Sequence, residues 1–458
     1  MRPTRWRRST HVAVGVTVLL LVAVVVVVAA VLSAGPSTEA AAVKPTPAAA
    51  TANPGVVPLA DSAPKPAPDR LLAALAPMLA DPNLGQLTGR VTDAKTDTQL
   101  WAQGAEVPMQ PASVNKTLTT AAALLTLDRD ARLITRVYSG SRPGVVVLKG
   151  GGDPTLSAAP APEETWYRDA ARISDLAEQV RGSGIEVTEV QVDTSAYSGP
   201  TMAPGWDPLD IDGGDIAPME SVMLDAGRTQ PVSVDSARSR TPALDAGRAL
   251  AAALRIDPAK VSVSPGSASG GKEIAAVQSP PLMSRLRDMM NASDNVMAEA
   301  IGREVAAEKN LPQSFDGAVR AVLGALDGAG VDTTGARLFD SSGLSVDDRL
   351  TARTLDGVVQ GAAGSEHPAL RPLVDLLPIA GGSGTLSNRY LEPGLRDSAG
   401  FLRAKTGSLT GTNSLAGIVT DASGRVLTFA LLSNNAGPTG RIALDNLAGT
   451  LRTCGCSA

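Results

Sequence analysis

Histidine is nearly absent from this sequence, and its shortage narrows the kinds of site that the chain can build. Only His11 and His367 are present among 458 residues. His11 precedes the first hydrophobic run, so a Ser-His-Asp triad would depend on His367 alone, in the loop-like segment AGSEHPAL. A zinc site built from several histidines is excluded. We expect neither a metal ion nor a cofactor.

The net charge and the cysteines exclude further classes of site. The formal net charge is −5, so the chain offers no basic field for nucleic acid and we expect no such partner. Both cysteines, Cys454 and Cys456, lie in the last five residues as CGC. This position favours a tail thiol pair without a structural role, and a strained disulfide between the two stays open.

The N-terminus has the pattern of a membrane-targeting segment. Residues 1–11 carry four arginines and form the predicted cytoplasmic basic segment, whereas residues 12–34 are uncharged. The uncharged run is long enough to cross a ~30 Å hydrocarbon layer as a helix. This favours a transmembrane signal-anchor, although small residues around Ala40 to Ala42 leave a cleaved signal peptide open. We therefore expect the rest of the chain on the extracytoplasmic face of the bacterial membrane, or in the cell wall after cleavage.

Composition also divides the rest of the chain. Residues 35–68 are rich in Ala, Pro and Thr and are predicted to form a linker. The folded part begins near Asp69, where DRLLAALAPMLA has the apolar spacing of a helix. A chain of this length is expected to contain two or more domains.

A serine and a lysine three residues apart, Ser113 and Lys116, precede a long apolar helix in PASVNKTLTTAAALLTL. On a helix these positions share a face. A serine hydroxyl needs a base to become a nucleophile, and a buried lysine with a lowered pKa can serve. The same spacing occurs at Ser62 in the Pro-rich linker and at Ser269 beside two glycines, where no such helix is expected. Alone, the pattern favours a helix-start serine with a solvated lysine over a catalytic pair.

Two further motifs follow in order along the chain. SDN at 293–295 precedes a helical stretch, and KTG at 405–407 occurs once and enters an alternating strand. A second Ser-x-Asn at 433–435 follows the KTG motif and has the context of a turn. Singly, these motifs fit a helix cap and a strand entry. All three motifs in this order, each in a suitable context, favour a catalytic site.

This ordered set resembles the serine penicillin-recognising enzymes, which comprise penicillin-binding proteins and serine β-lactamases. GGGDPTLS (150–157), DSSGLSVDDRLT (340–351) and PIAGGSGTLSNR (378–389) are similar to low-molecular-mass class C penicillin-binding proteins, the D-alanyl-D-alanine carboxypeptidases and endopeptidases of peptidase family S13. The resemblance covers about residues 70–450. It implies an α+β fold with a β-lactamase/transpeptidase-like core, in which helices flank an antiparallel sheet beside a helical lobe.

The resemblance also implies a large inserted region between the first two motifs. The transpeptidase-like domain would consist of residues 69–139 and 276–458, around an insert at 140–275 for which structural support is the expected role. The last part is predicted to form helices over 278–380, then strands near 403–408, 414–420 and 425–433 and a helix over 440–452.

Three residues receive catalytic roles from the resemblance. Ser113 attacks the carbonyl between two D-alanines to form an acyl-enzyme, and Lys116 takes the Ser113 proton. Ser293 passes a proton to the leaving amine through its link to the lysines. The backbone N–H groups of Ser113 and Ser408 would form the oxyanion hole.

Substrate-binding roles fall to five residues. Asn295 binds the peptide backbone of the substrate, and Lys405 and the Thr406 hydroxyl bind its terminal carboxylate. Gly407 lets the strand approach the substrate closely. Ser408 stands where many relatives have threonine and keeps the hydroxyl.

The implied function is a serine-type D-alanyl-D-alanine carboxypeptidase that trims peptidoglycan stem peptides and is inhibited by β-lactams, with endopeptidase activity left open. The alternatives are a serine β-lactamase and a non-catalytic peptidoglycan-binding or scaffold protein. The large insert disfavours the first alternative, and the intact motif residues disfavour the second. Asp294, at the variable position of its motif, either repels an anionic substrate or points to solvent, and solvent is favoured.

Overall fold

The computed structural model describes residues 62–454. The predicted segments at 1–11 and 12–34, most of the 35–68 linker and Cys456 lie outside the described residues. Cys454 is disulfide-bonded. Within residues 62–454, no helix combines the length and the apolar character that a membrane crossing requires.

The first sheet joins the two ends of the described chain. Its five strands lie in the order β2-β1-β10-β9-β8, and neighbouring strands are antiparallel. They are β1 (Gln86–Asp93), β2 (Thr98–Gln103), β8 (Leu402–Leu409), β9 (Thr412–Thr420) and β10 (Val426–Asn434). The meander predicted near 403–433 is therefore confirmed.

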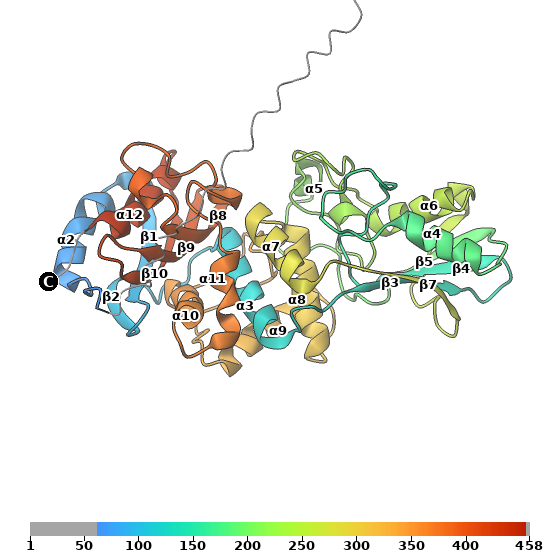
Figure 1. Cartoon of the computed structure of the whole chain (residues 1–458), viewed down its shortest axis with the longest axis horizontal. Coiled ribbons are helices and arrows are strands. Elements are labelled where there is room, and N and C mark those ends of the chain that lie inside the picture. Colours follow the sequence, from blue (N-terminus) through green and yellow to red (C-terminus); the bar gives the residue numbers. More distant parts are fainter. Residues whose placement is uncertain (1–61, 455–458) are drawn as a thin grey trace, which may run out of the picture. The chain divides into compact units, whose positions relative to one another are not determined.

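Helices cover both faces of this sheet because its strands present apolar side chains to both faces. Phe429 and Leu431 of β10 pack with α2 (Pro68–Leu79) and α12 (Gly440–Thr453). Their neighbours Ala430 and Leu432 pack into the helical lobe on the other face, since successive side chains of a strand point to opposite faces. Figure 1 shows α2 and α12 on one side of the sheet and α10 on the other.

The helical lobe contains the first two motifs. The 3-10 turn η2 (Ala112–Asn115) leads into α3 (Lys116–Thr126). The lobe also contains five helices that all lie in the predicted helical part at 278–380. They are α7 (Leu282–Ala292), α8 (Asn295–Glu308), α9 (Phe315–Gly328), α10 (Ala352–Ala363) and α11 (Pro372–Leu376).

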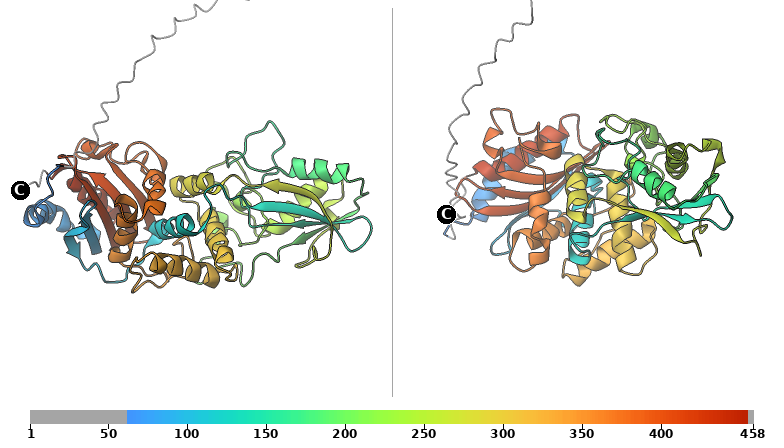
Figure 2. Two further views of the ribbon diagram at one scale, coloured as in Figure 1. Left: turned by 60° about the horizontal axis from the view of Figure 1, so that its bottom comes forward. Right: turned by 45° about the vertical axis from the view of Figure 1, so that its right-hand side comes forward.

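A second five-stranded sheet, in the order β6-β5-β4-β3-β7, fills the predicted insert. Its strands are β3 (Ile134–Ser139), β4 (Val145–Lys149), β5 (Glu189–Asp193), β6 (Val261–Val263) and β7 (Glu273–Gln278). The helices α4 (Ile173–Gly182) and α6 (Pro242–Ala253) share an apolar core with it. β3 leaves the helical lobe and β7 returns beside it (Figures 1 and 2).

The observed architecture is an α+β core with a large insert between the first two motifs, as the sequence predicted. The second sheet begins at β3, inside the segment assigned to the first transpeptidase part, and ends at β7. The domain boundaries at 140 and 275 stay a prediction.

Candidate active site

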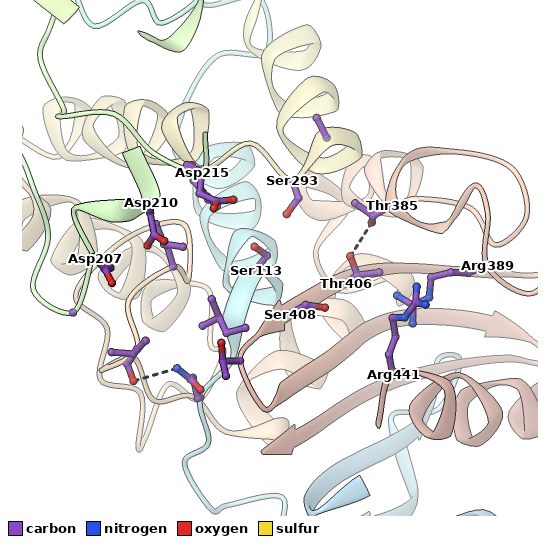
Figure 3. Close-up of a pocket in the computed structure, with 18 residues that line it drawn as sticks. Ser113, Asp207, Asp210, Asp215, Ser293, Thr385, Arg389, Thr406, Ser408 and Arg441 are labelled. Carbon is purple, nitrogen blue, oxygen red and sulfur yellow. Dashed lines mark hydrogen bonds between the residues drawn. The ribbon is translucent and has the colours of Figure 1, made fainter. Parts of the chain in front are cut away.

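A cavity of about 690 Å³ brings the three motifs together. Ser113 from η2, Ser293 from the end of α7, Asn295 from the start of α8, and Thr406 and Ser408 from β8 all line it. The short helix α5 (Leu209–Gly213) of the insert contributes a further wall. Figure 3 shows the two serines, Ser113 and Ser293, facing the middle of this cavity.

The backbone around Ser113 is held tightly by two glycines. A side chain at Gly407 would place its Cβ 2.1 Å from Ser414 Oγ and 2.9 Å from Ser113 N. A Cβ at Gly343, whose φ is +80°, would lie 2.0 Å from Ala112 O. Gly407 was expected to make room for substrate, and the close approach that requires it is to the backbone of η2. This approach also brings the Ser113 amide next to β8, where the second predicted oxyanion donor lies.

Lys116 is fully buried and its ammonium contacts three oxygens. Nζ lies 2.9 Å from Ser113 Oγ, 2.6 Å from Asn295 Oδ1 and 2.8 Å from Ser342 O. The amide and peptide oxygens can only accept hydrogen bonds. In neutral lysine they therefore take both N–H groups, which leaves the lone pair facing the Ser113 hydroxyl.

Burial lowers the pKa of Lys116 to about 8, because a charge in this interior loses its hydration. Four nearby carboxylates act in the opposite direction and raise this pKa; they belong to Asp340, Asp294, Glu299 and Asp215. The neutral form of Lys116 is therefore much more populated at neutral pH than that of a lysine in solution. A general base needs this neutral form.

The loop at 340–345 positions the carbonyl of Ser342 for Lys116. The Asp340 carboxylate accepts hydrogen bonds from the backbone N–H groups of Ser342, Gly343 and Ser345 at 2.6–3.0 Å. Trp206 Nε1 donates to the same carboxylate at 2.7 Å. The segment DSSGLS contributes to the family resemblance, but none of its residues was predicted to act in the site. An aspartate followed by Ser-Ser-Gly is the available signal, because Asp accepts from backbone N–H groups two or three residues on.

Ser293 lies at the sharp junction between α7 and α8, in a left-handed conformation with φ +57°. Lys405 Nζ donates to Ser293 Oγ at 2.9 Å and to Thr406 O at 2.8 Å. Lys116, by contrast, directs its hydrogen bonds within residues 62–454 to other partners. Of the two predicted lysine links of Ser293, the one to Lys405 is therefore present as a hydrogen bond.

Lys405 is fully buried and lies behind Ser293 rather than on the cavity wall. Burial and the neighbouring Lys116 hold its pKa well below the usual value for lysine. Both features weaken the expectation that Lys405 itself neutralises a substrate carboxylate. Thr406 does line the cavity, where its hydroxyl donates to Thr385 Oγ1 at 2.8 Å.

The SDN motif differs from expectation at its middle residue. Asp294 is buried and does not point to solvent. It caps α8 by accepting from Met297 N at 3.0 Å, and Tyr167 Oη donates to its second oxygen at 2.5 Å. Asn295 donates from Nδ2 to Asp215 O at 3.0 Å while its Oδ1 holds Lys116. Its side chain therefore joins the insert to the general base.

Opposite charges line the two ends of the cavity. Asp207, Asp210 and Asp215 lie on the side of the insert, and Arg389 and Arg441 lie beyond Thr406 (Figure 3). Burial raises the pKa of Asp210 and of Asp215. A substrate in this cavity would therefore meet acidic groups at one end and basic groups at the other.

Comparisons with known proteins give two family matches and several similar sequences. A model of the D-Ala-D-Ala carboxypeptidase 3 (S13) family matches residues 71–237 and 231–451, and a model of the carboxypeptidase Rv3627c-like N-terminal domain matches residues 1–58. The chain is 70% identical to carboxypeptidase DacB of Mycolicibacterium smegmatis and 61% identical to carboxypeptidase Rv3627c of Mycobacterium tuberculosis, with 100% of each chain covered.

Solved structures share the fold. Penicillin binding protein 4 (dacB) of Haemophilus influenzae superimposes with a TM-score of 0.67 at 21% identity, over 83% of this chain and 97% of that one. A structure of the same protein complexed with a β-lactam gives a TM-score of 0.64 at 20% identity, over 83% and 99% of the two chains.

Proposed function

The chain belongs to the D-Ala-D-Ala carboxypeptidase 3 (S13) family and is a serine-type D-alanyl-D-alanine carboxypeptidase, and we propose that it acts through an acyl-enzyme on Ser113. One observation carries the assignment of the nucleophile. The Nζ atom of a buried lysine, Lys116, lies 2.9 Å from Ser113 Oγ at the wall of a cavity. The β-lactamase and scaffold alternatives have no comparable support.

Acylation follows from the positions of the two serines and the lysine. Neutral Lys116 takes the proton of the Ser113 hydroxyl as Oγ attacks the carbonyl carbon between the two D-alanines. The oxyanion that forms accepts hydrogen bonds from the N–H groups of Ser113 and Ser408. When the C–N bond breaks, the proton held by Lys116 passes to the leaving amine, and the Ser293 hydroxyl on the cavity wall relays it.

Deacylation reverses the roles of the same groups. Water attacks the acyl carbon and gives a proton to Lys116, which returns it to Ser113 Oγ as the ester bond breaks. A β-lactam would acylate Ser113 in the same way, but its leaving group stays attached after ring opening. Slow deacylation and inhibition are therefore expected. The β-lactam complex of the Haemophilus influenzae protein supports this expectation.

Intact mass spectrometry of the full chain after incubation with benzylpenicillin tests the nucleophile. We expect one adduct, which maps to Ser113 and is absent from the Ser113→Ala variant. Ser269→Ala is a matched control, because Ser269 has the same spacing to a lysine and lies in a turn of the insert. An adduct that persists in Ser113→Ala and maps to another residue would refute the assignment.

We also propose that residues 12–34 hold the enzyme at the extracytoplasmic face of the membrane. Four arginines followed by 23 uncharged residues support an uncleaved anchor. Membrane fractionation of cells, followed by mass determination of the N-terminus, tests this. An intact N-terminus in the membrane fraction would support it, whereas a secreted product that begins near Ala40 to Ala42 would contradict it.

A further inference from the structure

The terminal carboxylate of a D-alanyl-D-alanine substrate needs a cation, and most basic groups near Ser113 already have partners. Lys116 and Lys405 are fully buried, and their hydrogen bonds go to serine, asparagine and backbone oxygens. Burial lowers the pKa of each. These two lysines are therefore arranged for proton transfer around the serines rather than for holding an anion in the open cavity.

Arg389, at the basic end of the cavity, is also committed. Its Nε donates to Asp445 Oδ2 at 2.9 Å, and its second nitrogen donates to Asp445 Oδ1. The side chain is only 8% exposed. A bidentate pair of this kind neutralises most of the charge of the arginine. Arg389 thus ties its loop to α12 and has little charge left for a ligand.

Arg441 differs from the other cations of the site. It lies in the first turn of α12, is exposed and lines the cavity. Within residues 62–454 no ion pair or hydrogen bond engages its guanidinium. Figure 3 shows its side chain directed toward the same end of the cavity as Thr406 and Ser408.

The opposite end of the cavity disfavours a carboxylate. Asp207, Asp210 and Asp215 would repel it there at close range. The substrate is therefore oriented with its carboxyl end toward β8 and α12, where the hydroxyls of Thr406 and Ser408 and the guanidinium of Arg441 line the cavity.

We propose that Arg441 binds the C-terminal carboxylate of the substrate. The Ser408 hydroxyl is a further donor, and the Thr406 hydroxyl becomes one when it turns away from Thr385 Oγ1. This inference rests on the proposed function, because it assumes that a peptide ending in D-Ala-D-Ala occupies the cavity. It makes Arg441 a specificity-determining residue, which selects substrates with a carboxylate directly after the cleaved bond.

Two substrates that differ in one group test the assignment. They are a stem-peptide analogue ending in D-Ala-D-Ala with a free carboxylate, and the same peptide with a C-terminal amide. For Arg441→Gln we expect kcat/KM on the acid to fall about tenfold to a hundredfold, the effect of losing a charge-assisted hydrogen bond. Hydrolysis of the amide should change less than twofold, so the preference for the acid collapses.

Control variants separate recognition of the carboxylate from folding. Arg320→Gln removes the same charge from an exposed arginine of α9, which pairs with Asp316, and should leave the preference for the acid intact. Arg441→Lys keeps the charge without the planar fork and should restore part of the preference. Added salt should lower kcat/KM on the acid in the parent enzyme and have little effect in Arg441→Gln.

The outcomes distinguish this inference from the proposed function. Equal losses on the acid and the amide, or an unchanged preference for the acid in Arg441→Gln, would overturn the role of Arg441. Those results would leave Ser113 as nucleophile as long as Ser113→Ala hydrolyses neither peptide. Hydrolysis by Ser113→Ala at the parent rate would instead overturn the proposed function.

Discussion

The pH dependence of acylation is the sharpest test of Lys116 as the general base. Only the neutral amine can take the Ser113 proton, so the acylation rate should follow the neutral fraction of Lys116. With the pKa lowered to about 8 by burial, that fraction is about 9% at pH 7 and about 91% at pH 9, by the definition of a pKa. The rate should therefore rise about tenfold between these two pH values.

The assay measures the rate of acylation by a chromophoric β-lactam after rapid mixing. The measurement is repeated at a series of pH values between 6 and 10. A β-lactam is preferable to a peptide because its leaving group stays attached and release of product cannot limit the signal. Circular dichroism at each pH checks that the fold is unchanged. A rate that is flat between pH 7 and pH 9, or that rises only near the usual lysine pKa of about 10.4, would refute the reasoning.

A single substitution shifts the same profile in a known direction. The carboxylate of Asp215 raises the pKa of Lys116, whereas its backbone oxygen holds Asn295. Asp215→Asn removes the charge and keeps the backbone contact. The pKa of Lys116 should then fall, and the rise in acylation rate should move to lower pH. A shift to higher pH would contradict the electrostatic account.

Three further substitutions have defined consequences. Lys116→Arg should lower the acylation rate by about a hundredfold to ten-thousandfold, because arginine stays charged and cannot act as a base; near-parental acylation would exclude that role. Asp340→Ala should lower the free energy of unfolding by about 3 kcal/mol or more, measured with denaturant, because several buried N–H groups lose their acceptor. Gly407→Ala should cost about 1–3 kcal/mol and slow acylation as well, since its Cβ would displace the backbone at Pro111 and Ser113.

Local sequence pattern was sufficient for much of the fold. The alternating segments near the C-terminus form β8, β9 and β10, and the final apolar period forms α12. In each case the side chains that decide the element are close in sequence. The contact between Ser113 and Lys116 was predictable for the same reason, because both residues lie within one helical turn.

Contacts between distant segments could not be read from the sequence. Asp294 was expected to face solvent because it is an acid at the variable position of its motif. It is buried instead and accepts a hydrogen bond from Tyr167, 127 residues away. Lys405 has the sequence context of a carboxylate-binding lysine, yet the helical lobe and β8 enclose it completely. Arg441 belongs to no motif, so only the fold brings it to the cavity.

The same distant contacts indicate what the inserted region contributes. Three of its residues contact the SDN motif or the loop that begins at Asp340. The backbone oxygen of Asp215 accepts from Asn295, Tyr167 donates to Asp294, and Trp206 donates to Asp340. Asn295 and the loop that begins at Asp340 supply two of the three oxygens around Lys116 Nζ. The insert therefore supports the site by fixing the acceptors that orient the lone pair of the general base. Trp206→Phe is a change confined to the insert, and it removes the hydrogen bond to Asp340. This substitution should slow acylation although it removes no group that binds the substrate.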